Sequence, residues 1–103
     1  MVASKFDQEA QRLAKLPRAE RFDELLDFPS DFTFKVIGRG KGFFQSVRAL
    51  LDGLGHADVI LVERPSAKGR YSSVSFNLMV DNGAMIDATY CALEALPNLV
   101  LVL

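Results

Sequence analysis

One alternating stretch near the middle of the chain, Tyr71–Val80, constrains the fold more than any other feature. From Val74 onward, apolar side chains occupy every second position: Val74, Phe76, Leu78 and Val80. Side chains alternate faces along a strand, so this pattern indicates one face in a core and one mostly polar face outside. Turn-forming residues at Pro65–Gly69 precede it, and the β-branched run Asp58–Glu63 comes before the turn. The sequence therefore predicts a hairpin whose second strand is the axis of the fold.

The segments around this hairpin complete a regular order of elements. Phe32–Ile37 alternates like a strand, and Leu99–Leu103 is a short apolar run. Apolar residues recur at helical spacing over roughly 43–54 and 84–96, each bounded by glycine or proline. The order strand, helix, strand, strand, helix, strand is that of the ferredoxin-like fold, an α+β, βαββαβ sandwich. We expect a four-stranded antiparallel sheet with two helices on one face, and with the first and third strands in its centre.

The N-terminal third is an addition to that domain. Apolar residues at helical spacing occur before Pro17 and again before Pro29, and acidic residues outnumber basic ones. We therefore divide the chain into an N-terminal helical extension, residues 1–27, and a ferredoxin-like domain, residues 28–103.

Composition excludes several classes of protein. A chain of 103 residues, 50% of them hydrophobic, suits one domain with one core. Its formal net charge of -1 gives no overall attraction to nucleic acid or to an anionic membrane. No apolar run reaches the roughly 20 residues needed to span a bilayer, and the N-terminus lacks the apolar core of a signal peptide. One cysteine cannot form an internal disulfide, which fits a reducing compartment. From these observations together we infer a cytoplasmic location and no membrane partner.

Residues that carry catalysis or bind metals are scarce. The only histidine, His56, lies in a predicted loop. The only cysteine, Cys91, lies on the second helix of the predicted domain, where we expect a packed or partly buried thiol. One histidine and one cysteine do not make the usual soft-ligand zinc site. We predict no catalytic residue, no metal and no cofactor, and thus a protein that is not an enzyme.

Basic residues gather at one end of the predicted sheet. There the loop after the first strand, the hairpin loop and the Pro97–Asn98 turn emerge together, beside the N-terminus of the helix at 43–54. Amides at a helix N-terminus attract anions, and glycines let the backbone approach a ligand closely. We predict a site for a small anion, a carboxylate or phosphate, or for an acidic partner; the alternative is a solvated basic end. Its residues are Gly38, Arg39, Gly40, Lys41, Arg64, Lys68 and Arg70.

The sheet face away from the helices is a second candidate surface. It is mostly small and polar, with Ile37 and Met79 as apolar spots. This face, or the N-terminal helix, suits a protein partner, and the apolar edge strand Leu99–Leu103 favours strand pairing in a homodimer. RNA is a third alternative, because this topology hosts the RNA-recognition motif. That motif has an aromatic residue just before the position of Val74, and this chain has Ser73 there instead. Nucleic acid is therefore not the expected partner.

Three stretches together resemble the YbeD-like family of small bacterial proteins of unassigned function. They are LLDFP at Leu25–Pro29, FTFKVIG at Phe32–Gly38 and PSAKGRYSSVS at Pro65–Ser75. The resemblance covers about Leu25–Leu103, and residues 1 to about 20 extend beyond the usual family length. It implies a ferredoxin-like fold similar to ACT regulatory domains, which bind amino acids and control enzymes. It implies no reaction, and so favours a non-enzymatic regulatory or binding module.

Overall fold

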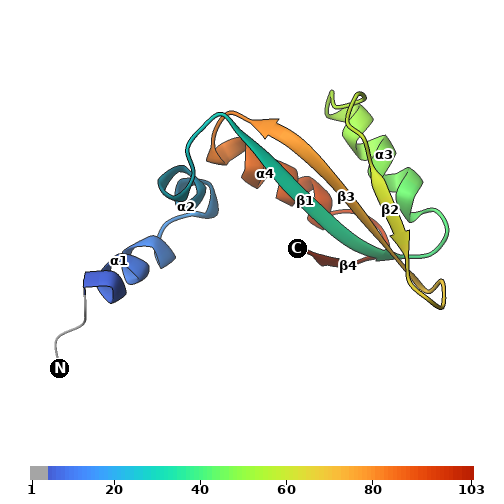
Figure 1. Ribbon diagram of the computed structural model, residues 1–103, viewed down its shortest axis with the longest axis horizontal. Coiled ribbons are helices and arrows are strands. Elements are labelled where there is room, and N and C mark those ends of the chain that lie inside the picture. The colour runs from blue at the N-terminus through green and yellow to red at the C-terminus, as the bar shows by residue number, and fades with distance from the viewer. Residues whose placement is uncertain (1–4) are drawn as a thin grey trace.

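A computed structural model describes residues 5–103, with side chains described from Asp7 onward (Figure 1). Of the predicted N-terminal extension, residues 1–4 lie outside the described residues. The elements in chain order are α1 (Lys5–Ala14), α2 (Arg18–Leu25), β1 (Ser30–Arg39), α3 (Phe43–Gly53), β2 (Val62–Pro65), β3 (Tyr71–Val80), α4 (Gly83–Glu94) and β4 (Leu99–Val102). The predicted α+β order is confirmed. Across the described part of the chain, every helix is too short or too polar to cross a membrane.

The four strands form one antiparallel sheet in the order β2-β3-β1-β4, so β1 and β3 are central as predicted. These two strands pair over ten residues, from Ser30 opposite Val80 to Arg39 opposite Tyr71. The edge strands are short, and both pair near the same end of the β1–β3 ribbon. Within residues 5–103, the other end of the ribbon therefore carries no flanking strand (Figure 1).

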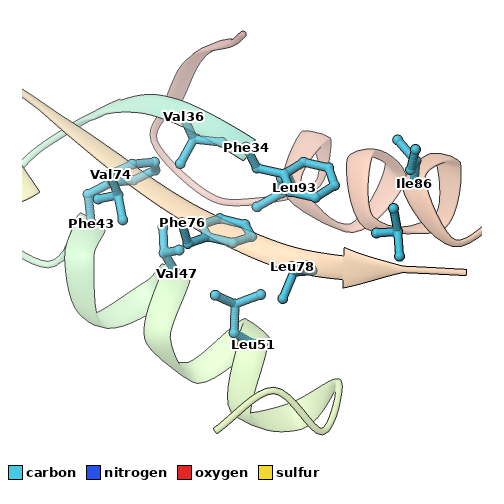
Figure 2. Close-up of a cluster of buried hydrophobic side chains, with 11 residues drawn as sticks. Phe34, Val36, Phe43, Val47, Leu51, Val74, Phe76, Leu78, Ile86 and Leu93 are labelled. Carbon is cyan, nitrogen blue, oxygen red and sulfur yellow. The ribbon is translucent and has the colours of Figure 1, made fainter. Parts of the chain in front are cut away.

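The core lies between the sheet and the helices α3 and α4 (Figure 2). The four apolar residues predicted to face inward from β3 are all buried, which confirms the alternation. They meet alternate residues of β1 and the inner faces of both helices. The remaining buried members are Phe34, Val36, Phe43, Val47, Leu51, Ile86 and Leu93. Burial of this apolar surface is the main favourable term that holds the two layers together.

Local signals fix where the two core helices begin and end. The side-chain oxygen of Asn82 accepts a hydrogen bond from the Met85 N–H at 2.9 Å, which caps the first turn of α4. Gly55 follows α3 with φ of +86°, a backbone conformation that favours glycine. There the His56 N–H donates to the Leu51 carbonyl oxygen at 2.8 Å and closes the helix end.

The predicted strand at Asp58–Glu63 is wrong over its first four residues, because β2 begins only at Val62. The chain before β2 is bound to α3 instead. The guanidinium of Arg48 donates hydrogen bonds to three backbone carbonyl oxygens, those of His56 (2.8 Å), Ala57 (3.2 Å) and Val59 (2.5 Å). These contacts hold the chain on the helix, so it does not continue along β3.

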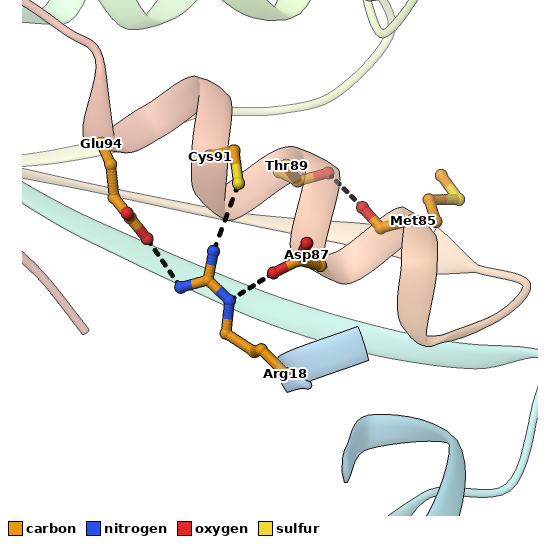
Figure 3. A network of polar contacts seen from close by, with 6 residues as sticks. All are labelled: Arg18, Met85, Asp87, Thr89, Cys91 and Glu94. Atoms are coloured by element: carbon orange, nitrogen blue, oxygen red, sulfur yellow. Dashed lines mark hydrogen bonds and ion pairs between the residues drawn. The ribbon is translucent and has the colours of Figure 1, made fainter. Parts of the chain in front are cut away.

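The helix α2 of the N-terminal extension is docked on α4 (Figure 3). The guanidinium of Arg18 contacts Asp87 at 2.5 Å and Glu94 at 2.7 Å, and lies 5.1 Å from the centre of the Tyr90 ring. Burial raises the pKa of Tyr90, against the opposing effect of the nearby Arg18 charge. One turn further along α2, Asp23 accepts a hydrogen bond from the Gly83 N–H at 2.6 Å. The extension thus supplies a carboxylate to the N-terminus of α4.

Cys91 is exposed, so the prediction of a packed or partly buried thiol is wrong. The buried side of α4 is formed by Ile86, Thr89 and Leu93. At 100° per residue, position 91 falls well away from that side. The Cys91 Sγ instead accepts a hydrogen bond from an Arg18 nitrogen at 3.5 Å (Figure 3).

Candidate functional site

Two of the predicted site residues project from the sheet itself. Because Phe34 and Val36 point into the core, the alternation along β1 places Arg39 on the opposite face. Arg39 is paired with Tyr71, and its guanidinium carbon lies 5.6 Å from the centre of that ring. Arg64 is paired with Ser73, so its side chain extends from the same face. Tyr71 thus lies among basic side chains on the outer face of the sheet.

Three loops meet at this end of the sheet, as predicted. Lys41 lies in the loop between β1 and α3, and Lys68 and Arg70 lie in the turn between β2 and β3 (Figure 1). The Arg39 N–H donates to the Asn98 carbonyl oxygen at 2.9 Å, which fixes the Pro97–Asn98 turn beside them. The structure therefore brings the predicted basic residues to one end of the molecule.

Two shallow hollows flank Tyr71. The smaller, of about 240 Å³, lies between the β1–α3 loop and the β2–β3 turn, and Lys41, Gly40 and Gly69 line it. The larger, of about 330 Å³, lies against the turn itself and is lined by Lys68 and Arg70. Both are open to solvent, so a bound ligand would keep part of its surface in water.

The charge at this end is uncompensated. All five basic side chains are exposed, and none forms an ion pair within the described residues. Glu63 is the one acid among the residues that line the two hollows. We call this surface the basic loop end, defined by Arg39, Lys41, Arg64, Lys68 and Arg70. Unpaired charge of one sign around a concave surface attracts and concentrates an anion.

Neutral hydrogen-bonding groups lie close to these cations. The helix α3 begins after Gly42, and no side chain caps it. Amides of its first turn are therefore available to an acceptor. Ser72 lines the smaller hollow, and its buried hydroxyl oxygen has no hydrogen-bond partner within the described residues. The amides can donate to an oxygen of a bound anion, whereas the Ser72 hydroxyl lies on the inward side of β3, below the surface.

Gly38 is the one predicted site residue that the structure buries. A Cβ at this position would overlap with the ring of Phe43. The close packing of Gly38 against Phe43 thus helps to position the loop from its buried side, whereas Arg39, Gly40 and Lys41 are at the surface. Gly40 has φ of +88° and no neighbour within 4 Å of an added Cβ, so it serves the turn and leaves space above it.

The predicted anion site does not include Tyr71 or Ser72, which line the smaller hollow. Alternation alone places Tyr71 on the outer face of β3. Its position beside Arg39 depends on the register between β1 and β3, which no local pattern reveals.

Residues 5–103 contain no group of three or more His, Cys, Asp or Glu side chains that is suited to a metal ion.

Comparison with known proteins identifies the family. Residues 23–103 match a family described as a protein of unknown function, DUF493. A UPF0250 protein of Shewanella piezotolerans is 36% identical over 77 residues, covering 74% of this chain and 88% of the relative. A UPF0250 protein of Idiomarina loihiensis is 37% identical over 75 residues, covering 72% and 85%. One of Haemophilus influenzae is 32% identical over 71 residues, covering 68% and 77%.

No solved structure matches the chain. The match to the family extends over most of the sequence and includes the three stretches that carried the resemblance, which is confirmed. The chain therefore belongs to the DUF493 (UPF0250) family of bacterial proteins, the YbeD-like family, whose function is unassigned.

Proposed function

We propose that the protein is a non-enzymatic, cytoplasmic regulatory or binding module that takes a small anionic metabolite, a carboxylate or phosphate, at the basic loop end. The observation that carries the proposal is the group of five exposed, unpaired basic side chains around Tyr71. Elsewhere in the described chain, Arg12, Arg18 and Arg48 are all ion-paired. The basic loop end differs because five cations without an acidic partner gather there, whereas the other unpaired cations of the described chain, Lys15, Arg21 and Lys35, lie elsewhere.

The side chains present suit an oxyanion. A guanidinium donates two parallel hydrogen bonds to a carboxylate or phosphate, and such charge-assisted bonds are about twice as strong as neutral ones. The contact with the Tyr71 ring orients the Arg39 guanidinium while leaving its N–H edge free. The open hollows favour a ligand bound by its charged group over one enclosed on all sides.

The first test is a titration of the isotope-labelled protein, followed by amide NMR, with pooled amino acids, other carboxylates and nucleotides. We expect saturable shifts at residues 38–42 and 68–70. The double variant Arg39→Ala, Lys68→Ala should bind the ligand at least about tenfold more weakly, because two charge-assisted contacts are lost. The matched control is Lys15→Ala, Arg21→Ala, which removes the same charge from the N-terminal extension. Equal affinity of the two double variants would contradict the proposal.

A protein-interaction adaptor is the second candidate, because apolar side chains border the outer sheet face at β4. Leu101 is 47% exposed beside Ile37, and Leu103 is 54% exposed. The outer edge of β4 also has no strand beside it within the described residues. A second copy pairing along β4 would cover both features.

Sedimentation at micromolar to millimolar concentrations tests this homodimer. We expect the mass to rise above 11.4 kDa with concentration, and Leu101→Lys to return it to the monomer value. A monomer mass throughout would contradict pairing.

RNA is the third candidate, and the sheet supports it least. Single-strand binding uses successive aromatic platforms, whereas Tyr71 is the one aromatic residue at an outward-facing position of the four strands.

A further inference from the structure

The geometry points to a second binding site, separate from the basic loop end, at the unpaired edge of β3. We propose that it binds an extended segment of a partner protein in which apolar residues alternate with basic ones. We call this site the open β3 edge; it comprises residues 76–80 on the side of the sheet where β2 lies. The site is formed by unpaired backbone groups of β3 and by the side chains beside that strand, and it does not depend on the anion site.

The backbone of β3 has unused hydrogen-bonding groups at this edge. The pairing of β2 with β3 stops at Val62 opposite Ser75, while β3 continues to Val80 (Figure 1). The Ser66 N–H donates to the Tyr71 carbonyl oxygen at 2.8 Å, so the odd-numbered residues of β3 face β2. Because neighbouring residues point their N–H and C=O groups to opposite sides, those of Asn77 and Met79 face the open edge. An extended chain that lies beside this edge can form hydrogen bonds with these N–H and C=O groups, as a further strand of the sheet does.

A groove runs beside the unpaired edge. It measures about 520 Å³, and its lining is mostly apolar, with Val59, Ile60, Val62 and Phe76 beside Asn77. The side chain of Ile60 is 81% exposed, more than any other large apolar side chain of the described core domain. Met79 is 61% exposed at the end of the strand. An added strand would cover both of these side chains.

The groove is held open by the protein itself. The hydrogen bonds from Arg48 to the carbonyls of residues 56, 57 and 59 fix the chain that would otherwise extend β2. Natural proteins usually protect strand edges with a charge, a proline or a covering loop. Here the neighbouring loop is bound away from the edge, so the binding position is already formed in the free protein.

The charge of the groove defines the chemistry of the partner. Asp58 lines the groove, and Asp81 follows the end of β3; both are exposed, and neither forms an ion pair within the described residues. A basic residue in the added strand would pair with these carboxylates, while its apolar neighbours cover Ile60 and Met79. The apolar strand β4 of a second copy carries no cation and fits this groove less well.

The experiment uses the full chain and a synthetic peptide, acetyl-Val-Lys-Val-Lys-Val-Lys-Val-amide. In the free protein, the amides of Asn77 and Met79 should exchange with solvent quickly, and those of Phe76 and Leu78, which face β1, slowly. Peptide binding should slow exchange at Asn77 and Met79 at least about tenfold. Slow exchange there in the free protein, whether or not it depends on concentration, would overturn the proposal.

Three controls separate strand addition from simple attraction. The same peptide methylated on alternate backbone nitrogens should bind about tenfold or more weakly, since it cannot donate to the edge. Asp58→Asn should weaken binding about twofold to fivefold, as expected for an exposed ion pair. The variant Arg39→Ala, Lys68→Ala should leave it unchanged. Equal binding of the methylated peptide, full affinity with Asp58→Asn, loss of affinity with Arg39→Ala, Lys68→Ala, or no binding at millimolar peptide would each overturn the proposal.

Discussion

Replacing Gly83 with alanine is expected to lower the free energy of unfolding by about 3 kcal/mol, which is large for a domain of this size. Gly83 begins α4 where α2 crosses it, and it is buried. A Cβ at this position would overlap with the carbonyl oxygen of Ala19 and lie 2.9 Å from the Asp23 carboxylate. Since the obstacle is backbone, no side-chain rotation removes it. The helix α2 would have to move away and would lose the hydrogen bond from Gly83 to Asp23.

Urea unfolding followed by circular dichroism measures the effect. The matched control is Gly53→Ala at the end of α3, where an added Cβ meets nothing within 4 Å. This control should leave stability unchanged or raise it by up to about 1 kcal/mol, because alanine is the better helix former. Asp23→Ala should cost about 1–2 kcal/mol in the native background and almost nothing in Gly83→Ala, because α2 is already displaced there. Full additivity of the two changes would contradict the docking of α2 on α4.

The parts of the fold that were predictable have a local cause. The alternation of Tyr71–Val80 requires one buried face, and the structure buries that face. The order of elements then limits the sheet to few topologies, and the observed order β2-β3-β1-β4 is the expected one. Local patterns were sufficient because burial decides these features residue by residue.

The features that were missed depend on contacts between distant segments. The late start of β2 results from Arg48 on α3, and β-branched residues at 58–61 gave no sign of it. The contact that Cys91 makes with Arg18 joins residues 73 apart in the chain, although the exposure of Cys91 itself follows from its position on α4, away from the buried side. The division into residues 1–27 and 28–103 stays a prediction; α2 and α4 pack together across it.

For the candidate site, the sequence indicated that cations gather at one end of the sheet, but not whether each of them forms an ion pair. Connectivity alone places the loops that carry Arg39, Lys41 and Lys68 at one end of the sheet. Whether each cation is paired depends on side-chain positions. Arg48 is just as basic in the sequence, but in the structure it is paired with Asp52 and donates to the Val59 carbonyl oxygen. The contact between Arg39 and Tyr71 depends on strand register, which is set over the full length of β1 and β3. The sequence therefore located the surface, and the structure shows which groups are free on it.

Replacing Gly38 with alanine is expected to destabilise the protein by about 2 kcal/mol, because it overfills a packed position. Gly38 lies at an inward-facing position of β1, opposite Ser72. The ring of Phe43, the first residue of α3, already occupies the space of a Cβ there. Phe43 is itself 1% exposed, so it has no free volume to enter. The start of α3 would have to shift, and the loop of residues 39–42 would shift with it.

This variant tests whether that loop is positioned from below. Gly42→Ala is the matched control, because Gly42 has φ of -90° and an added Cβ meets nothing within 4 Å. It should lower stability by no more than about 1 kcal/mol, because Gly42 is the N-cap of α3 and alanine is a poorer N-cap than glycine. Amide spectra of Gly38→Ala should show shifts at Arg39, Lys41 and Ser72, whereas those of Gly42→Ala should show only local ones. If Gly38→Ala were as stable as Gly42→Ala, Phe43 would not be packed tightly against β1. The position of the loop of residues 39–42 would then not depend on this contact.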